Sequence, residues 1–365
     1  MDDKGIAKGG GGKTMTSKQR DGKDFRWGIW GTGTIASAFA ADIQTSGDMR
    51  VTAVCSRSME SATSFKTRIG ADKAFDDTAA FLNTAEIDAV YIATPSAMHV
   101  QQTLQAIAAG KVCLTEKPVT LDADGANKIA SASRAYNVFA MEAMWSRFLP
   151  AIHATREHIK SGRIGTVKRI EADLSYFRAE DPQSRFFNPA LGGGAAFDLG
   201  VYPVSLALSF LGLPYAVSGR WTKAKSGVDM RTEITLTYAN ATAELSCGFD
   251  RDGQNQMLIE GTNGAILIHA PFLKAQRLAI FSPNVLNSAL GPKGPGGLIG
   301  KVLNRLPLPG RTVEHHAFAG NGLQFQAQAV RDAVTRGEIS SPIMPLEHSA
   351  AVADIVSTVL RMQPD

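Results

Sequence analysis

The 365-residue chain has little cysteine, little net charge and no long hydrophobic run. Its three cysteines (Cys55, Cys113 and Cys247) lack any C-x-x-C spacing, which argues against a disulfide framework and favours reduced thiols in a cytoplasmic protein. A formal charge of +4 is small for this length and argues against a nucleic-acid partner. Because no run approaches the length of a membrane-spanning helix, we expect no membrane partner.

The spacing of the histidines also does not match a metal-binding pattern. His153 and His158 are five residues apart, which is the wrong spacing for one helix face. His315 and His316 are adjacent in an expected loop, without a cluster of cysteine or carboxylate around them. We therefore expect no metal site.

Two segments are rich in residues that disfavour packed structure. Residues 1–24 contain much Gly, Lys and Ser and lack the apolar core of a signal peptide, so we expect a disordered N-terminal extension. Residues 282–310 are rich in Gly and Pro and predict a flexible loop. The remaining chain is long enough for two domains with separate cores.

The stretch Phe25–Ala36, F-R-W-G-I-W-G-T-G-T-I-A, has the pattern of a strand, a glycine turn and a helix. Gly31 and Gly33 occupy the first two positions of the G-x-G-x-x-G/A dinucleotide fingerprint, and Ala36 occupies the third. Gly31 permits a sharp turn, and Gly33 lets backbone N–H groups approach a pyrophosphate at the start of the helix. The expected cofactor contacts here are Gly31, Thr32, Gly33, Thr34 and Ile35. Taken alone, the pattern also fits an ordinary turn.

The next apolar strand, Arg50–Cys55, ends in Ser56 and Arg57. NAD-binding proteins usually carry Asp or Glu at this point to hold the ribose 2′-hydroxyl. A hydroxyl and a guanidinium can instead bind a 2′-phosphate, and Arg57 can stack on adenine. The sequence therefore predicts NADP, with NAD as the alternative; Arg57 is otherwise a solvated surface residue.

Two later strands end in residues suited to the same crevice, because ligands bind at the carboxyl ends of parallel strands. The strand Asp88–Thr94 stops at Pro95, and His99 opens the helix that follows. The strand Lys111–Thr115 ends in Glu116-Lys117-Pro118, where an acid and a proline fix the backbone of the lysine. The further cofactor contacts we expect are Thr94, Pro95, His99, Glu116 and Lys117, although His99 equally fits a plain helix-start residue.

The second half changes to alternating strands, which predict an open, largely antiparallel sheet. The expected strands are 166–177, 216–225, 232–238, 242–249, 256–260 and 265–269. Within this half, Asp198 and Tyr202 are four residues apart, which places them on one face of a helix. A loop that contains Phe177, Arg178, Arg185 and Phe186 also has the reach to approach the pocket, but we assign no contact to any one of these residues. Helices are expected over 323–336, crossing back to the first domain, and over 346–362.

The predicted fold class is therefore α/β. A Rossmann domain with a doubly wound parallel sheet covers 25–148, and a C-terminal α+β domain with an open, mostly antiparallel sheet covers 149–365. We assign the second domain to substrate binding and oligomerisation. Because the exposed face of such a sheet is commonly buried against a second copy, we expect a homodimer through this sheet.

The glycine turn, the Glu116-Lys117-Pro118 strand end and the Asp198–Tyr202 pair together resemble the Gfo/Idh/MocA family of oxidoreductases. The resemblance spans Phe25 to Met362. The segments M-E-A-M-W-S-R-F-L-P-A, G-G-G-A-A-F-D-L-G-V-Y and N-G-L-Q-F-Q-A are similar to the branch of trans-1,2-dihydrobenzene-1,2-diol and NADP-dependent D-xylose 1-dehydrogenases.

The resemblance implies hydride transfer between a nicotinamide and a vicinal diol or cyclic sugar. Lys117 matches the family's catalytic lysine, Tyr202 the proposed acid/base and Asp198 the aspartate before it. A lysine cation beside Tyr202 is expected to lower the tyrosine pKa. Trp145 and Arg147 are substrate-contact candidates or, equally, domain-interface residues. Which of Lys117 and Tyr202 transfers the proton stays open at this point. Lys117 as a structural partner of Glu116, Tyr202 as a core residue and Asp198 as a helix cap also remain alternatives. A non-catalytic NADP-sensing regulator is the alternative for the whole protein.

Overall fold

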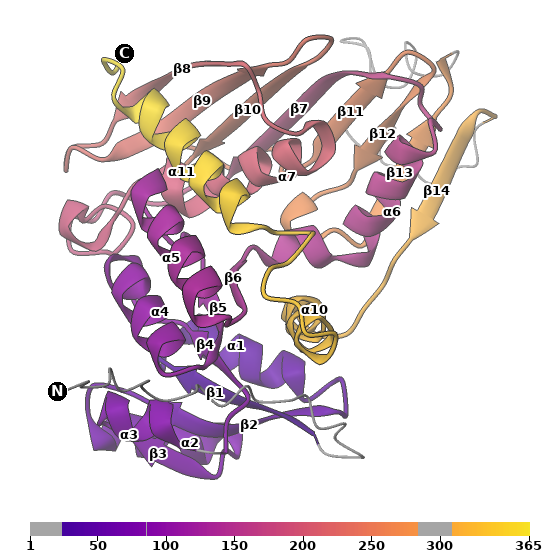
Figure 1. Ribbon diagram of the computed structural model, residues 1–365. Coiled ribbons are helices and arrows are strands. Elements are labelled where there is room, and N and C mark those ends of the chain that lie inside the picture. Colours follow the sequence, from indigo (N-terminus) through magenta and orange to yellow (C-terminus); the bar gives the residue numbers. More distant parts are fainter. Residues whose placement is uncertain (1–23, 85, 284–308) are drawn as a thin grey trace, which may run out of the picture.

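The computed structural model describes residues 24–84, 86–283 and 309–365. They form a parallel six-stranded sheet at one end of the molecule and an eight-stranded sheet at the other (Figure 1). The extension expected over residues 1–24 lies outside the described residues except for Asp24, and so does most of the loop expected over 282–310.

The first domain has the strand order β3-β2-β1-β4-β5-β6, and all its neighbouring strands are parallel. This is the doubly wound order of a Rossmann fold, which confirms the predicted class. Apart from the edge strand β3, its strands are largely apolar and buried on both faces because helices cover both sides. The strands are β1 (Phe25–Trp30), β2 (Met49–Cys55), β3 (Lys73–Phe75), β4 (Ala89–Ile92), β5 (Val112–Glu116) and β6 (Ala140–Ala143).

The helices of this domain begin in two different ways. The helices are α1 (Thr34–Ile43), α2 (Met59–Ile69), α3 (Thr78–Asn83), α4 (His99–Ala108) and α5 (Ala123–Tyr136). Ser58, Asp77 and Asp122 cap α2, α3 and α5 by accepting a backbone N–H in the first turn. Helix α1 starts after Gly33, which has no side chain to cap it, so the first backbone N–H groups of α1 receive no hydrogen bond from a capping side chain.

The second domain has the strand order β14-β13-β12-β11-β7-β10-β9-β8. Only the β7–β10 pair is parallel, so the prediction of a mostly antiparallel sheet is confirmed. The sequence analysis missed β3, β13 and β14, which are short; β14 also reads R-T-V-E-H and lacks an apolar face. The strands are β7 (Val167–Ser175), β8 (Ala216–Lys223), β9 (Asp229–Thr237), β10 (Thr242–Gly248), β11 (Met257–Gly261), β12 (Gly264–Ile268), β13 (Arg277–Phe281) and β14 (Arg311–His315).

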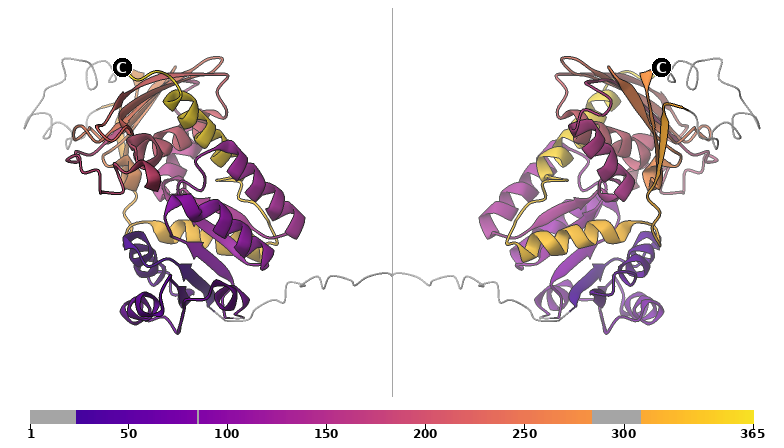
Figure 2. Two further views of the ribbon diagram at one scale, coloured as in Figure 1. Left: turned by 90° about the vertical axis from the view of Figure 1, so that its left-hand side faces the viewer. Right: turned by 90° about the vertical axis from the view of Figure 1, so that its right-hand side faces the viewer.

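Helices cover one face of this sheet (Figures 1 and 2). They are α6 (Pro150–Lys160), α7 (Val201–Leu211) and α11 (Leu346–Leu360). The segment Pro189–Leu211 is long and apolar enough to cross a membrane, contrary to the expectation that no run approaches that length, but 72% of its apolar window is buried inside the molecule. That burial is typical of a core helix.

Helix α10 (Leu323–Thr335) follows the second sheet in sequence but lies against α1 of the first domain, as predicted (Figure 1). The buried carboxylate of Asp42 in α1 accepts the backbone N–H groups of Asn321 and Leu323, each at 2.9 Å. Gly322 between them has φ 100°, a conformation that favours glycine. A side chain of the first domain therefore caps a helix of the second half of the chain.

Candidate active site

The glycine turn after β1 has the shape that a dinucleotide needs. Gly31 has φ 117°, and a Cβ there would lie 2.6 Å from the carbonyl oxygen of Ala93. A Cβ on Gly33 would meet nothing within 4 Å, so the space in front of the uncapped α1 helix is open. Open space at a free helix N-terminus fits a pyrophosphate. Thr32 is half-buried, and Thr34 and Ile35 are exposed at the same turn.

Ser56 and Arg57 follow β2, the strand next to β1. Arg57 is exposed, and its side chain has no hydrogen bond or ion pair with the residues that the structure describes. Its guanidinium is therefore available to a ligand at the edge where the glycine turn lies. Pro95 is likewise exposed after β4, whereas the hydroxyl of Thr94 is already bonded to Gln102.

His99 is buried, with 1% of its surface exposed. Its Nδ1 lies 2.8 Å from the carbonyl oxygen of Pro118 and its Nε2 lies 2.7 Å from that of Thr94. Burial lowers the pKa of this imidazole, and a neutral imidazole has one N–H to donate. The side chain thus lies between the loop after β4 and the loop after β5, donates to one of their two carbonyl oxygens, and does not open into the crevice.

Lys117 follows β5 and contacts the second domain. Its Nζ donates to the backbone oxygen of Asp198 at 2.6 Å and lies 3.3 Å from Oδ1 of the same residue. The ammonium also lies 4.8 Å from the centre of the Tyr202 ring. The Lys117 and Asp198 side chains are only 13% and 16% exposed. The three residues predicted to be catalytic therefore meet at one point between the domains.

Asp198 and Tyr202 lie on a helix that changes type between them. Asp198 belongs to a π-helical turn, Ala196–Gly200, and Tyr202 to the first turn of α7. Pro203 has no N–H to donate back to that turn, which disfavours regular α-helix there. Single π-turns are frequent at functional sites. Asp198 and Tyr202 both contact Lys117, as their four-residue spacing predicted for one face of a helix. The helix between them is a π-turn followed by α-helix, not the regular α-helix expected.

The charges in this cluster are coupled. Burial alone would lower the pKa of Lys117, but the Asp198 carboxylate, with Tyr202 and Glu116, holds it above its ordinary value. Burial alone would raise the pKa of Asp198, but Lys117 and Arg185 hold it below its ordinary range. The lysine is therefore an ammonium and the aspartate a carboxylate at neutral pH.

The expectation that Lys117 lowers the pKa of Tyr202 requires a correction. Lys117 does act in that direction, but burial acts more strongly, so the pKa of Tyr202 is raised overall. The ammonium faces the ring, while the hydroxyl lies 3.2 Å from Nε1 of Trp145. Tyr202 is a neutral phenol in this structure, and Trp145 is in direct contact with it.

Glu116 lies behind Lys117 and does not face the crevice. The hydroxyl of Tyr91 donates to Oε1 of Glu116, and the backbone N–H of Lys117 donates to its Oε2 at 3.2 Å. Burial raises the pKa of Glu116 to about 7, against these hydrogen bonds. Its carboxyl group fixes the backbone from which Lys117 projects.

Arg147 lies in the interior between the domains. It is fully buried, donates to the hydroxyl and carbonyl oxygens of Ser205 at 2.7 and 2.5 Å, and donates to the carbonyl oxygen of Ile343 at 2.8 Å. Burial lowers its pKa to about 9. These contacts support the interface role of Arg147 and argue against direct substrate contact.

Sequence reasoning named Arg178 and Arg185 as members of a loop with the reach to approach the pocket, but assigned neither of them a contact. Nη1 of Arg185 lies 3.4 Å from Oδ1 of Asp198, the atom that Lys117 also contacts. Both arginines lower the pKa of Asp198. The sequence shows a loop after β7 that is rich in arginine and phenylalanine. Whether that loop folds toward Lys117 and Asp198 depends on tertiary packing, which the sequence pattern does not show.

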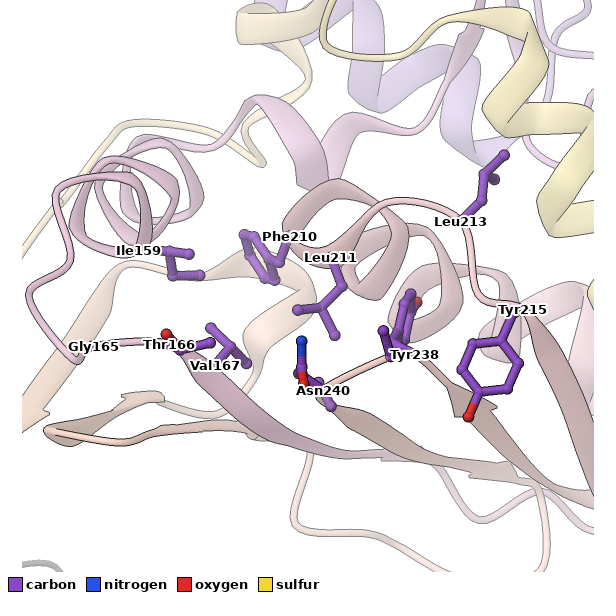
Figure 3. Close-up of a pocket in the computed structure, with 12 residues that line it drawn as sticks. Ile159, Gly165, Thr166, Val167, Phe210, Leu211, Leu213, Tyr215, Tyr238 and Asn240 are labelled. Carbon is purple, nitrogen blue, oxygen red and sulfur yellow. The ribbon is translucent and has the colours of Figure 1, made fainter.

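Other hollows and histidines lie apart from this cluster. A cavity of about 660 Å³ lies between the end of α7 and the β7 and β9–β10 region, and no predicted site residue lines it (Figure 3). Among the described residues, no group of three or more His, Cys, Asp and Glu side chains is suited to a metal ion. His158 and His316 do share a carboxylate, Glu314, which the sequence analysis overlooked.

Two family models match the chain on either side of the predicted domain boundary, which itself stays a prediction. Residues 25–143 match "Oxidoreductase family, NAD-binding Rossmann fold", and residues 152–267 match "GFO/IDH/MocA C-terminal domain". Together with the crevice geometry, these matches define a nicotinamide-dinucleotide-dependent oxidoreductase.

Curated relatives cover almost the whole chain. Trans-1,2-dihydrobenzene-1,2-diol dehydrogenase of Xenopus laevis is 30% identical, over 92% of this chain and 97% of the relative. D-xylose 1-dehydrogenase (NADP(+)) of Hypocrea jecorina is 29% identical, over 92% and 91%. The chain therefore belongs to the Gfo/Idh/MocA family, as its motifs indicated.

A solved structure agrees with the fold. The 3-ketoreductase KijD10 of Actinomadura kijaniata, in complex with NADP and TDP-benzene, matches with a TM-score of 0.75 at 24% identity. The match covers 93% of this chain and 97% of that one.

Proposed function

We propose that this protein transfers a hydride between NADP and the hydroxyl or carbonyl carbon of a vicinal diol or cyclic sugar. The observation that carries the proposal is the meeting of Lys117, Asp198 and Tyr202 between the two domains. The diol and sugar substrates follow the names of the relatives, which are dehydrogenases of a diol and of D-xylose.

Each residue of the cluster has a separate role in the proposed reaction. A nicotinamide, when bound, supplies the hydride acceptor or donor. Tyr202 gives its proton to the carbonyl oxygen in reduction and takes the hydroxyl proton in oxidation. Lys117 stabilises the phenolate that forms after the proton leaves, and Asp198 holds the ammonium in place. Trp145 orients the tyrosine hydroxyl.

The preference for NADP rests on Ser56 and Arg57. Arg57 is exposed beside the glycine turn, and neither residue is an acid that would repel a 2′-phosphate. The H. jecorina relative carries NADP(+) in its name. We expect the KM for NADP+ to be lower than the KM for NAD+.

The test is an assay with NADP+ or NAD+ and a panel of trans-diols and aldopyranoses, following nicotinamide reduction. Lys117→Met and Tyr202→Phe should each lower kcat about 10²- to 10⁴-fold while leaving cofactor affinity nearly unchanged. The controls are Lys128→Met and Tyr136→Phe, which alter exposed side chains. Tight NADP binding without turnover on any substrate would reject the enzyme in favour of an NADP sensor.

We also propose a homodimer through the uncovered face of the eight-stranded sheet, in a cytoplasmic protein. That face carries a groove of about 830 Å³ whose lining includes Glu171, Asp173 and Glu244. Arg169 lies among three carboxylates there, Glu171, Glu244 and Glu260. Because this face carries more carboxylates than cations, two copies of it repel at low salt, so the dimer should strengthen as salt screens that repulsion, which sedimentation velocity at low and high NaCl would measure. A monomer at both salt concentrations would reject it.

A further inference from the structure

The loop between β7 and the π-turn brings an exposed guanidinium to the catalytic cluster. Nη1 of Arg185 lies 3.4 Å from the Asp198 oxygen that Lys117 approaches at 3.3 Å. The side chain of Arg185 is nevertheless 67% exposed, against 13% for Lys117. A cation that touches the cluster and still faces solvent is placed to meet an entering ligand.

Arg185 is held by an aromatic stack. The Phe186 ring centre lies 4.1 Å from Cζ of Arg185 and 3.6 Å from Cζ of Arg178. Both guanidinium groups therefore make cation–π contacts with the same ring. Phe249 packs edge-on against Phe186, with ring centres 5.6 Å apart. These contacts limit the freedom of the loop arginine.

The cluster has more positive than negative charge. Lys117, Arg178 and Arg185 all act on Asp198 and lower its pKa. Within the described part of the chain, the guanidinium of Arg178 has no carboxylate partner at ion-pair distance. Glu116 behind Lys117 has a pKa raised to about 7 and is only partly ionised at neutral pH. The three cations therefore outnumber the negative charges of this partly buried site, and an anionic ligand would be favoured there.

We propose that the substrate of this protein carries a carboxylate or a phosphate and that Arg185 binds this group. The inference rests on the proposed function and narrows its substrate class to anionic sugars or diols. Arg185 and Lys117 contact the same oxygen of Asp198, so we place the anionic group beside the reacting carbon and not on it. A guanidinium suits both anions, since it offers two parallel N–H donors to a pair of oxygens.

The first experiment measures anion binding by the full chain saturated with NADPH, so that the cofactor occupies its own phosphate sites. Inorganic phosphate and acetate are titrated separately by calorimetry. We expect Arg185→Gln to weaken their binding about tenfold or more, the effect of losing a charge-assisted hydrogen bond. The matched control is Arg163→Gln, which removes an exposed arginine without a side-chain partner in the described residues and should change nothing. Equal anion affinity in wild type and Arg185→Gln would overturn the inference.

The second experiment compares kcat/KM for D-glucose, D-glucuronate and D-glucose 6-phosphate with NADP+. The sugars share a ring, so a preference for glucuronate indicates a carboxylate site and a preference for the phosphate ester a phosphate site. We expect at least one anionic sugar to exceed glucose about tenfold, and Arg185→Gln to bring that ratio close to one. Turnover of glucose equal to both anions would contradict the inference. If none of the three sugars turns over, the proposed reaction does not extend to these sugars. The binding experiment then decides by itself whether Arg185 binds an anion.

Discussion

The buried contact between Asp42 and the start of α10 should contribute measurably to stability. In Asp42→Ala, the backbone N–H groups of Asn321 and Leu323 lose their acceptor. The side-chain amide of Asn321, 3.3 Å from the carboxylate, loses it too. An unsatisfied buried donor costs about 1–3 kcal/mol, and loss of a helix cap costs up to about 2 kcal/mol. Because these costs overlap, we expect Asp42→Ala to lower the free energy of unfolding by about 2–4 kcal/mol.

A second contact between the first domain and α10 provides the control. Asp48 pairs with Arg331 of α10, but its side chain is 56% exposed. Exposed ion pairs contribute about 0–1 kcal/mol. Asp48→Ala therefore removes a carboxylate at the same boundary without leaving a buried donor unpaired.

Thermal unfolding followed by circular dichroism compares the two variants. At about 2–4 °C per kcal/mol for chains of this order of size, Asp42→Ala should lower the midpoint by roughly 4–16 °C. Asp48→Ala should lower it by at most about 4 °C. Since a two-domain chain need not unfold in one step, the first transition is the one to compare. Equal shifts for the two variants would refute the argument that burial of the cap matters.

Three further predictions concern the crevice. Arg57→Asp should raise the KM for NADP+ about tenfold or more and favour NAD+, measured as the ratio of kcat/KM for the two cofactors; an unchanged ratio would remove Arg57 from the cofactor site. Gly31→Ala should weaken cofactor binding in a fluorescence titration, because its Cβ would meet Ala93, whereas Gly47→Ala, with φ 71° and open space, should not. Because the pKa of Tyr202 is raised and its base form is the phenolate, the rate of oxidation should rise with pH above neutrality and that of reduction should fall. A flat pH profile for both directions would contradict Tyr202 as the proton carrier.

Features fixed by local backbone chemistry were predictable from the sequence. The glycine turn needs a residue that tolerates φ 117° at Gly31, and the chain provides it immediately after an apolar strand. Lys117 follows a buried strand and precedes a proline, so its place at the sheet edge follows from the strand order. The Rossmann order and the antiparallel second sheet followed from similar periodic patterns.

Features fixed by tertiary packing were not predictable. The raised pKa of Tyr202 arises from burial, which no spacing reveals. Arg147 is fully buried because Ser205 and Ile343 offer it oxygen acceptors from elsewhere in the chain. The partners of Asp42 lie almost the whole described chain away from it. Such contacts depend on which surfaces meet, and composition does not determine that.

The π-turn before α7 has a geometric consequence for the whole site. A π-turn is equivalent to an α-helix with one residue inserted, and each residue of an α-helix turns the chain by about 100°. Asp198 is therefore rotated by roughly that angle relative to the side of α7 that packs on the sheet. Helix α7 can keep its apolar side in the core while the turn before it faces Lys117. The inserted residue thus sets the direction of Asp198 separately from the packing of α7, which carries Tyr202, and deletion of a single residue from the turn would rotate Asp198 relative to α7.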